Sequence, residues 1–163
     1  MPEDLVDSDI TKAYTLPSTF YNDPNIFQNV RKAFTNSWLF AAHESELAEY
    51  KVYPLNQMDD LGEAMILTRE EETDEYRILS NVCTHRGMII NQNPCSDRLM
   101  QCPYHGRTFS LDGKFRNMPE FDGVSGFPSP SDDLNEYDLS RWKGLQFVRI
   151  EKESSDFKHI SAE

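Results

Sequence analysis

The segments Cys83-Thr84-His85-Arg86-Gly87 and Cys102-Pro103-Tyr104-His105-Gly106 decide how this chain is interpreted. Each segment offers one thiolate and one imidazole, and residues 86–101 separate the two pairs. In the first segment a single residue lies between the cysteine and the histidine, which is tight for two bonds to one tetrahedral zinc ion. The spacing suits two ligands that bind two different metal atoms lying side by side. The pattern therefore indicates a two-metal centre enclosed by two loops, and a structural zinc site is the alternative.

The two segments resemble the cluster-binding signature of Rieske proteins, in which two cysteines bind one iron of a [2Fe–2S] cluster and two histidines bind the other. The resemblance implies that Cys83 and Cys102 hold the iron that remains ferric. It implies that His85 and His105 hold the outer iron, where the electron resides on reduction. Four further residues would lie against the cluster: Arg86, Gly87, Tyr104 and Gly106. The two glycines would let the backbone approach the sulfides closely.

Further motifs extend the resemblance to the N-terminal domain of Rieske non-haem iron oxygenase large subunits, of the aromatic-ring-hydroxylating type. These motifs are Trp38, His43-Glu44-Ser45-Glu46-Leu47, Asn81-Val82, Leu111-Asp112-Gly113-Lys114-Phe115 and Trp142-Lys143-Gly144. That family hydroxylates aromatic rings or demethylates small amines. The resemblance runs from about Asp23 to Ile150, which is nearly the whole chain.

Short apolar runs separated by turn residues predict strands from Trp38 onward. The expected strands lie at 38–41, 50–55, 64–68, 76–81, 108–111, 114–117 and 145–150. Asp112-Gly113 predicts a two-residue hairpin turn, and the Pro-, Gly- and Ser-rich stretch 121–133 predicts a long surface loop. We therefore expect an all-β fold, a Rieske-type antiparallel β-sandwich with a two-loop cluster-binding subdomain and one N-terminal helix.

The expected helix begins with Asp23 as N-cap and Pro24 at the first helical position. Ile26, Val30 and Phe34 follow at helical spacing and form an apolar stripe, which either packs onto the domain or contacts a partner domain. We expect three parts along the chain. They are an N-terminal arm and helix (1–37), a Rieske [2Fe–2S] domain (38–150) and a polar C-terminal tail (151–163).

Three residues near the two segments predict a low reduction potential. High-potential Rieske proteins of respiratory complexes carry a disulfide between the two cluster loops, and this chain has Met88 and Tyr104 at those positions. The same proteins place a serine after the second His-Gly, where this chain has Arg107. Fewer hydrogen bonds to the sulfurs lower the potential. Arg107 also departs from the oxygenase pattern, which usually has tryptophan there.

Composition limits the partners and the compartment. The net charge of −12 argues against binding of nucleic acid, because phosphates require clustered Lys and Arg. It suits a basic face on a docking electron donor. We expect neither a leader peptide nor a membrane span, because the first residues are acidic and no long apolar run occurs. Cys95 would be the one thiol outside the metal site, which favours a reducing cytoplasm.

The resemblance implies one-electron transfer, with a reductase or ferredoxin as donor and a mononuclear-iron oxygenase domain as acceptor. That second iron needs two histidines and a carboxylate. The two remaining histidines, His43 and His159, lie far apart in the sequence, so we expect this chain to lack that site. We interpret it as the Rieske domain of a truncated or split oxygenase, which would be a homotrimer when complete. A free-standing Rieske ferredoxin is the alternative, and a structural zinc module is a minor one.

Overall fold

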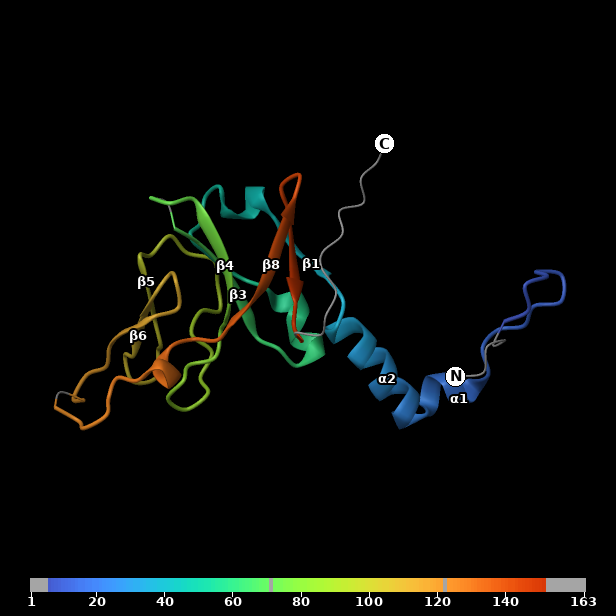
Figure 1. Ribbon diagram of the computed structural model, residues 1–163, viewed down its shortest axis with the longest axis horizontal. Helices are drawn as coiled ribbons and strands as arrows, with labels where there is room; N and C mark the ends of the chain where they lie inside the picture. Colours follow the sequence, from blue (N-terminus) through green and yellow to red (C-terminus); the bar gives the residue numbers. More distant parts are fainter. Residues whose placement is uncertain (1–5, 71, 122, 152–163) are drawn as a thin grey trace.

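The computed structural model describes residues 6–70, 72–121 and 123–151, in which two antiparallel sheets form the body of the molecule (Figure 1). The larger sheet has the strand order β1-β9-β8-β4-β3-β2, and the smaller one has the order β5-β6-β7. The larger sheet is built from β1 (Leu39–His43), β2 (Val52–Pro54), β3 (Met65–Glu70), β4 (Glu75–Ser80), β8 (Glu136–Trp142) and β9 (Leu145–Arg149). The smaller sheet is built from β5 (Leu99–Gln101), β6 (Thr108–Ser110) and β7 (Phe115–Asn117). The expected all-β antiparallel class is confirmed.

Helix α2 (Pro24–Thr35) is the helix that the sequence predicts. The Asp23 carboxylate accepts a hydrogen bond from the backbone N–H of Asn25 at 2.8 Å, so the predicted cap is present. A five-residue helix, α1 (Ser18–Asn22), precedes it and was not predicted. Both helices extend away from the sheets (Figure 1). The apolar stripe does not pack onto the domain, because Val30 is 37% exposed and Phe34 is 52% exposed.

The two predicted hairpins are present, one with a different turn. Strands β3 and β4 pair from Met65 opposite Ser80 to Glu70 opposite Glu75. Strands β6 and β7 are joined by a four-residue loop, residues 111–114, instead of the two-residue turn expected from Asp112-Gly113. The longer loop closes because the Ser110 N–H donates to the carbonyl oxygen of Lys114 at 2.9 Å.

Strand β8 was not predicted, although it lies between β4 and β9 inside the larger sheet. Three of its residues are charged, and each forms an ion pair with a residue of another element. The pairs are Glu136 with Arg77 (3.1 Å), Asp138 with Arg149 (2.6 Å) and Arg141 with Glu44 (3.4 Å). Three short 3-10 turns complete the fold: η1 (Glu44–Leu47), η2 (Asn56–Leu61) and η3 (Pro130–Asp132).

The buried residues form two groups, and one of them supports the region of the two sequence segments. That group brings Cys83 and Cys102 together with eight apolar residues from strands and loops: Val52, Ile66, Leu79, Ile90, Met100, Phe109, Leu111 and Leu134. The second group underlies β1, β3 and β9. The predicted boundaries at 37/38 and 150/151 remain predictions, and residues 152–163 of the predicted tail lie outside the described residues.

Candidate metal centre

The two sequence segments form a pair of loops with the same backbone hydrogen bonds. We name them loop A (residues 83–88, after β4) and loop B (residues 102–107, between β5 and β6). In each loop the cysteine N–H donates to the carbonyl oxygen of the residue five positions on, at 2.8 Å. The glycine N–H four residues on donates back to the cysteine carbonyl oxygen, at 3.0 Å in loop A and 3.1 Å in loop B. Each loop thereby projects its histidine beside its cysteine.

The sulfur and nitrogen donors lie at different depths. Cys83 and Cys102 are 3% and 2% exposed, whereas His85 and His105 are half-buried. The two imidazole rings lie with their centroids 4.9 Å apart and their planes at 65°. The ring of Tyr104, which is exposed, lies 3.7 Å from that of His105. The structure thus brings all four predicted donors together, with the thiols inside and the imidazoles at the surface.

Burial and nearby charges set the protonation of the donors. Burial raises the pKa of the Cys83 thiol and outweighs a backbone hydrogen bond from His85, which lowers it. The neighbouring Cys102 raises this pKa further, and the Arg107 charge has the smallest, lowering effect. Desolvation lowers the pKa of His85, and the positive charges of Arg86, His105 and Arg107 add to this shift. Neutral imidazole is the form that binds metal, whereas a protonated thiol must lose its proton when metal binds.

The donor set fits a [2Fe–2S] group in its chemistry. One iron of a Rieske cluster takes two thiolates and the other takes two imidazoles, and the loops offer a buried thiol pair and a half-buried imidazole pair. Among the residues that the structure describes, no three or more His, Cys, Asp and Glu side chains gather as they would around a single metal ion. Each pair is what one iron of the cluster requires.

The backbone conformation of loops A and B requires glycine at positions 87 and 106, a reason that the sequence interpretation did not include. Gly87 and Gly106 both have φ of +73°, in the left-handed region that other residues rarely adopt. A Cβ atom on Gly87 would meet nothing within 4 Å, whereas one on Gly106 would lie 3.3 Å from Cγ of Pro119. The loops therefore require glycine first for the backbone angle. Arg86 is exposed at the tip of loop A.

Residues whose contacts at the site the sequence does not predict join or cover the two loops. Arg107 is 3% exposed, and its guanidinium contacts Thr84 of loop A and Asp132 of η3. Phe121, from the predicted surface loop, lies with its ring centroid 6.1 Å from that of His85. The stretch 121–133 therefore folds back over loops A and B. No local pattern could reveal this, because Asp132 lies 25 residues from Arg107 in the chain.

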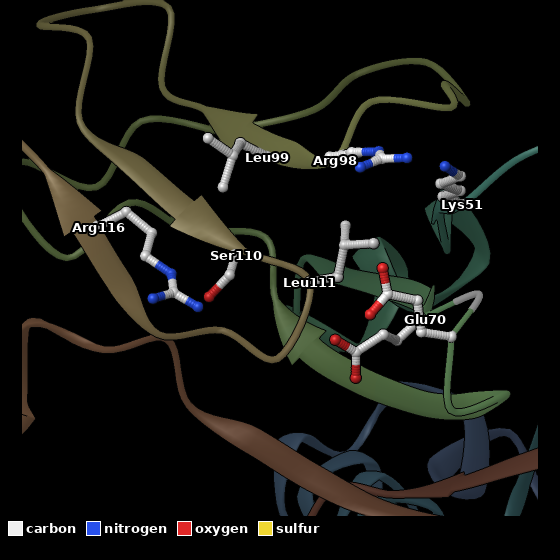
Figure 2. A pocket seen from close by; sticks show the side chains of 8 residues that line it. Lys51, Glu70, Arg98, Leu99, Ser110, Leu111 and Arg116 are labelled. Atoms are coloured by element: carbon white, nitrogen blue, oxygen red, sulfur yellow. The ribbon is translucent and has the colours of Figure 1, made fainter.

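A separate pocket lies beside the small sheet (Figure 2). It is lined by residues of both charges, with Lys51, Arg98 and Arg116 as the basic ones and Glu70 and Glu72 as the acidic ones. None of the eight predicted site residues lines it. Its position therefore separates it from loops A and B. Cys95 is not part of loops A and B; it is half-buried against the core group that contains Cys83 and Cys102, and burial raises the pKa of its thiol.

Residues 37–128 match the family described as the Rieske [2Fe-2S] domain. The chain belongs to this family. The match contains both loops, so the [2Fe–2S] cluster is the cofactor of this domain. Within the described residues, no helix has the length and apolar character needed to cross a membrane.

The Rieske chain is similar to subunits of several oxygenases. It is 31% identical over 142 residues to the carnitine monooxygenase oxygenase subunit of Escherichia coli (strain K12), covering 86% of this chain and 37% of that protein. It is 28% identical over 170 residues to the toluate 1,2-dioxygenase subunit alpha of Pseudomonas putida, covering 99% of this chain and 37% of the relative.

A solved structure shows the same relation. The quaternary ammonium Rieske monooxygenase CntA in complex with L-carnitine superimposes with a TM-score of 0.76 and 27% identity, covering 88% of this chain and 41% of that one. The chain therefore spans well under half the length of the relatives that it matches. The resemblance to oxygenase large subunits, expected from the sequence, is confirmed.

Proposed function

We propose that this chain transfers single electrons through a Rieske cluster held by Cys83, Cys102, His85 and His105, as the electron-transfer domain of an oxygenase that acts on a small molecule. When bound, the cluster takes up and releases one electron. The single observation that carries the proposal is the pairing of buried thiols with half-buried imidazoles in two loops of matching backbone geometry.

The arrangement of the donors suits this role. The buried cysteines keep one side of the site away from water, and the imidazoles reach the surface, where another protein can approach. We propose a reductase or ferredoxin as donor and a mononuclear-iron oxygenase domain as acceptor. The oxygenase relatives support the acceptor, because each is more than twice as long as the part that matches this chain. A homotrimer and a cytoplasmic location remain predictions.

Anaerobic reconstitution with iron and sulfide tests the ligand assignment. We expect two iron and two acid-labile sulfide per chain, a red-brown colour, and a rhombic spin-resonance signal after reduction. Cys83→Ser and His105→Gln should abolish or strongly alter that signal. The matched controls are Cys95→Ser and His43→Gln, because these residues lie outside loops A and B, and both variants should keep it. A wild-type protein that holds zinc and no labile sulfide would refute the proposal.

A further inference from the structure

We propose that Arg107 is a positioning residue that ties loop A to loop B and supplies a positive charge that raises the potential of the cluster between them. The inference rests on the proposed function, because it takes loops A and B as the parts that hold the cluster. It assigns a role to a residue that the sequence interpretation treated only as a departure from the family pattern.

Arg107 contacts both loops at once. It is the last residue of loop B, and its backbone carbonyl oxygen accepts the hydrogen bond from the N–H of Cys102 that closes this loop. Its side chain crosses to loop A, where Nη1 donates to Oγ1 of Thr84 at 2.6 Å. Thr84 lies between the two proposed ligands of loop A. A single side chain therefore joins the two halves of the site.

The hydrogen bonds around this contact form a connected network. The hydroxyl of Thr84 accepts from Arg107 and donates its own proton to the backbone carbonyl oxygen of Asp132 at 2.8 Å. One carboxylate oxygen of Asp132 accepts from Nη2 of Arg107 at 2.9 Å. The other accepts from the N–H of Ser129 at 2.8 Å and from its hydroxyl at 3.0 Å. Each of the three guanidinium nitrogens thus has an acceptor, with Nε directed to the sulfur of Met118, and a buried polar network with its groups satisfied holds one geometry.

The guanidinium is shielded from water. Its side chain is 4% exposed, and its central carbon lies 5.2 Å from the ring centroid of Phe115 and 5.4 Å from that of Phe127. Nε lies 3.4 Å from the sulfur of Met118. Charges in such surroundings are screened less than charges in water. The charge of Arg107 therefore acts on loops A and B, with Asp132 as its counter-charge.

The two parts of the proposed role respond differently to substitution. Bridging needs the planar fork, which lysine cannot reproduce, whereas the effect on potential needs only the charge. A positive charge near the site favours the state with one more electron, and the carboxylate of Asp132 opposes it. Changes to Arg107 and to Asp132 should therefore move the potential in opposite directions.

The first measurement is the midpoint potential of reconstituted chains. Arg107→Met should lower it by about a tenfold change in the one-electron reduction equilibrium. Asp132→Asn should raise it, and Arg107→Lys should leave it close to the wild-type value. The matched control is Arg149→Met, because Arg149 also pairs with an aspartate and lies over an aromatic ring, but on β9 of the larger sheet. This control should not change the potential.

The second measurement is the half-time of cluster loss in the presence of a chelator, followed by visible absorbance. Arg107→Met, Arg107→Lys and Thr84→Val should each shorten it by about tenfold or more, which is the scale of effect known for residues that support metal ligands. The double variant Arg107→Met/Thr84→Val should lose the cluster no faster than Arg107→Met, because both changes break one contact.

The outcomes separate the two proposals. Wild-type protein without labile sulfide refutes the proposed function. Wild-type protein with the expected cluster, but with equal potentials in Arg107→Met and Arg149→Met, overturns the role of the charge. Additive effects of Arg107→Met and Thr84→Val on cluster loss overturn the bridge between the loops.

Discussion

Asp132 and Asp133 are neighbours in the chain, yet each anchors a different part of the cluster-binding region. Asp132 pairs with Arg107 and thereby with the two loops. Asp133 accepts a hydrogen bond from the N–H of Phe115 at 2.8 Å and pairs with Nζ of Lys114 at 2.9 Å, so it holds the hairpin of β6 and β7. One short stretch of chain therefore fixes both the loops and the sheet beneath them. The sequence interpretation placed both residues in a surface loop and assigned no role to either.

The pKa of Asp133 predicts how this anchor depends on pH. The backbone N–H of Phe115 and the ammonium of Lys114 hold that pKa below its ordinary value of 3.8. A carboxylate with a lowered pKa stabilises the folded state above the unfolded-state value and loses this contribution as pH falls through its folded-state value. Urea unfolding at pH 5 should show wild type more stable than Asp133→Asn. The difference should shrink as pH falls below about 3.8, and a difference that stays constant would contradict the prediction.

At the scale of single elements, the β6–β7 hairpin depends on one glycine. Gly113 has φ of +79° and lies in the loop that reverses the chain. A Cβ atom placed there would lie 3.1 Å from Cδ2 of Leu79, a fully buried residue of β4. The hairpin thus approaches the larger sheet more closely than a side chain allows.

We expect Gly113→Ala to lower the free energy of unfolding by about 1–3 kcal/mol, through backbone strain and the contact with Leu79. Gly123→Ala is the matched control, because Gly123 has φ of +78° but an added Cβ would meet nothing within 4 Å. Its effect in denaturant unfolding should be clearly smaller. Equal losses in the two variants would show that the close contact has no cost.

The elements that could be predicted are those with a local signal. The cap formed by Asp23, the short apolar runs of β3 and β4, and the paired Cys-His spacing all act within a few residues. Strand β8 could not be predicted, because its charges are satisfied by partners up to 97 residues away in the chain. The contacts of Arg107 could not be predicted for the same reason, because its partners come from three separate segments of the chain.

At the scale of the whole molecule, the sequence lacks the features of high-potential Rieske proteins. Met88 and Tyr104 occupy the positions of the loop disulfide, and Arg107 directs its side chain to Thr84 and Asp132. Rieske centres range from about −150 to +300 mV.

We predict a midpoint potential in the lower part of this range, because Arg107 replaces the serine hydroxyl that donates a hydrogen bond to the cluster in the respiratory proteins. The Arg107 charge raises the potential, but Asp132 largely balances this charge. We therefore still expect a value in the lower part of the range. Protein-film voltammetry on the reconstituted chain measures the value. A midpoint well above about +150 mV, in the upper part of the known range, would contradict the prediction.

Because the thiols are buried and the imidazoles reach the surface, the order in which partner proteins can exchange electrons with this chain is restricted. If electrons pass by way of the two imidazoles, each electron enters and leaves at the same surface, because the cysteine side is closed by the core. Two proteins cannot occupy that surface at the same time. The supplier and the recipient of each electron must then take turns, and an inert form of either should act as a competitive blocker of the other.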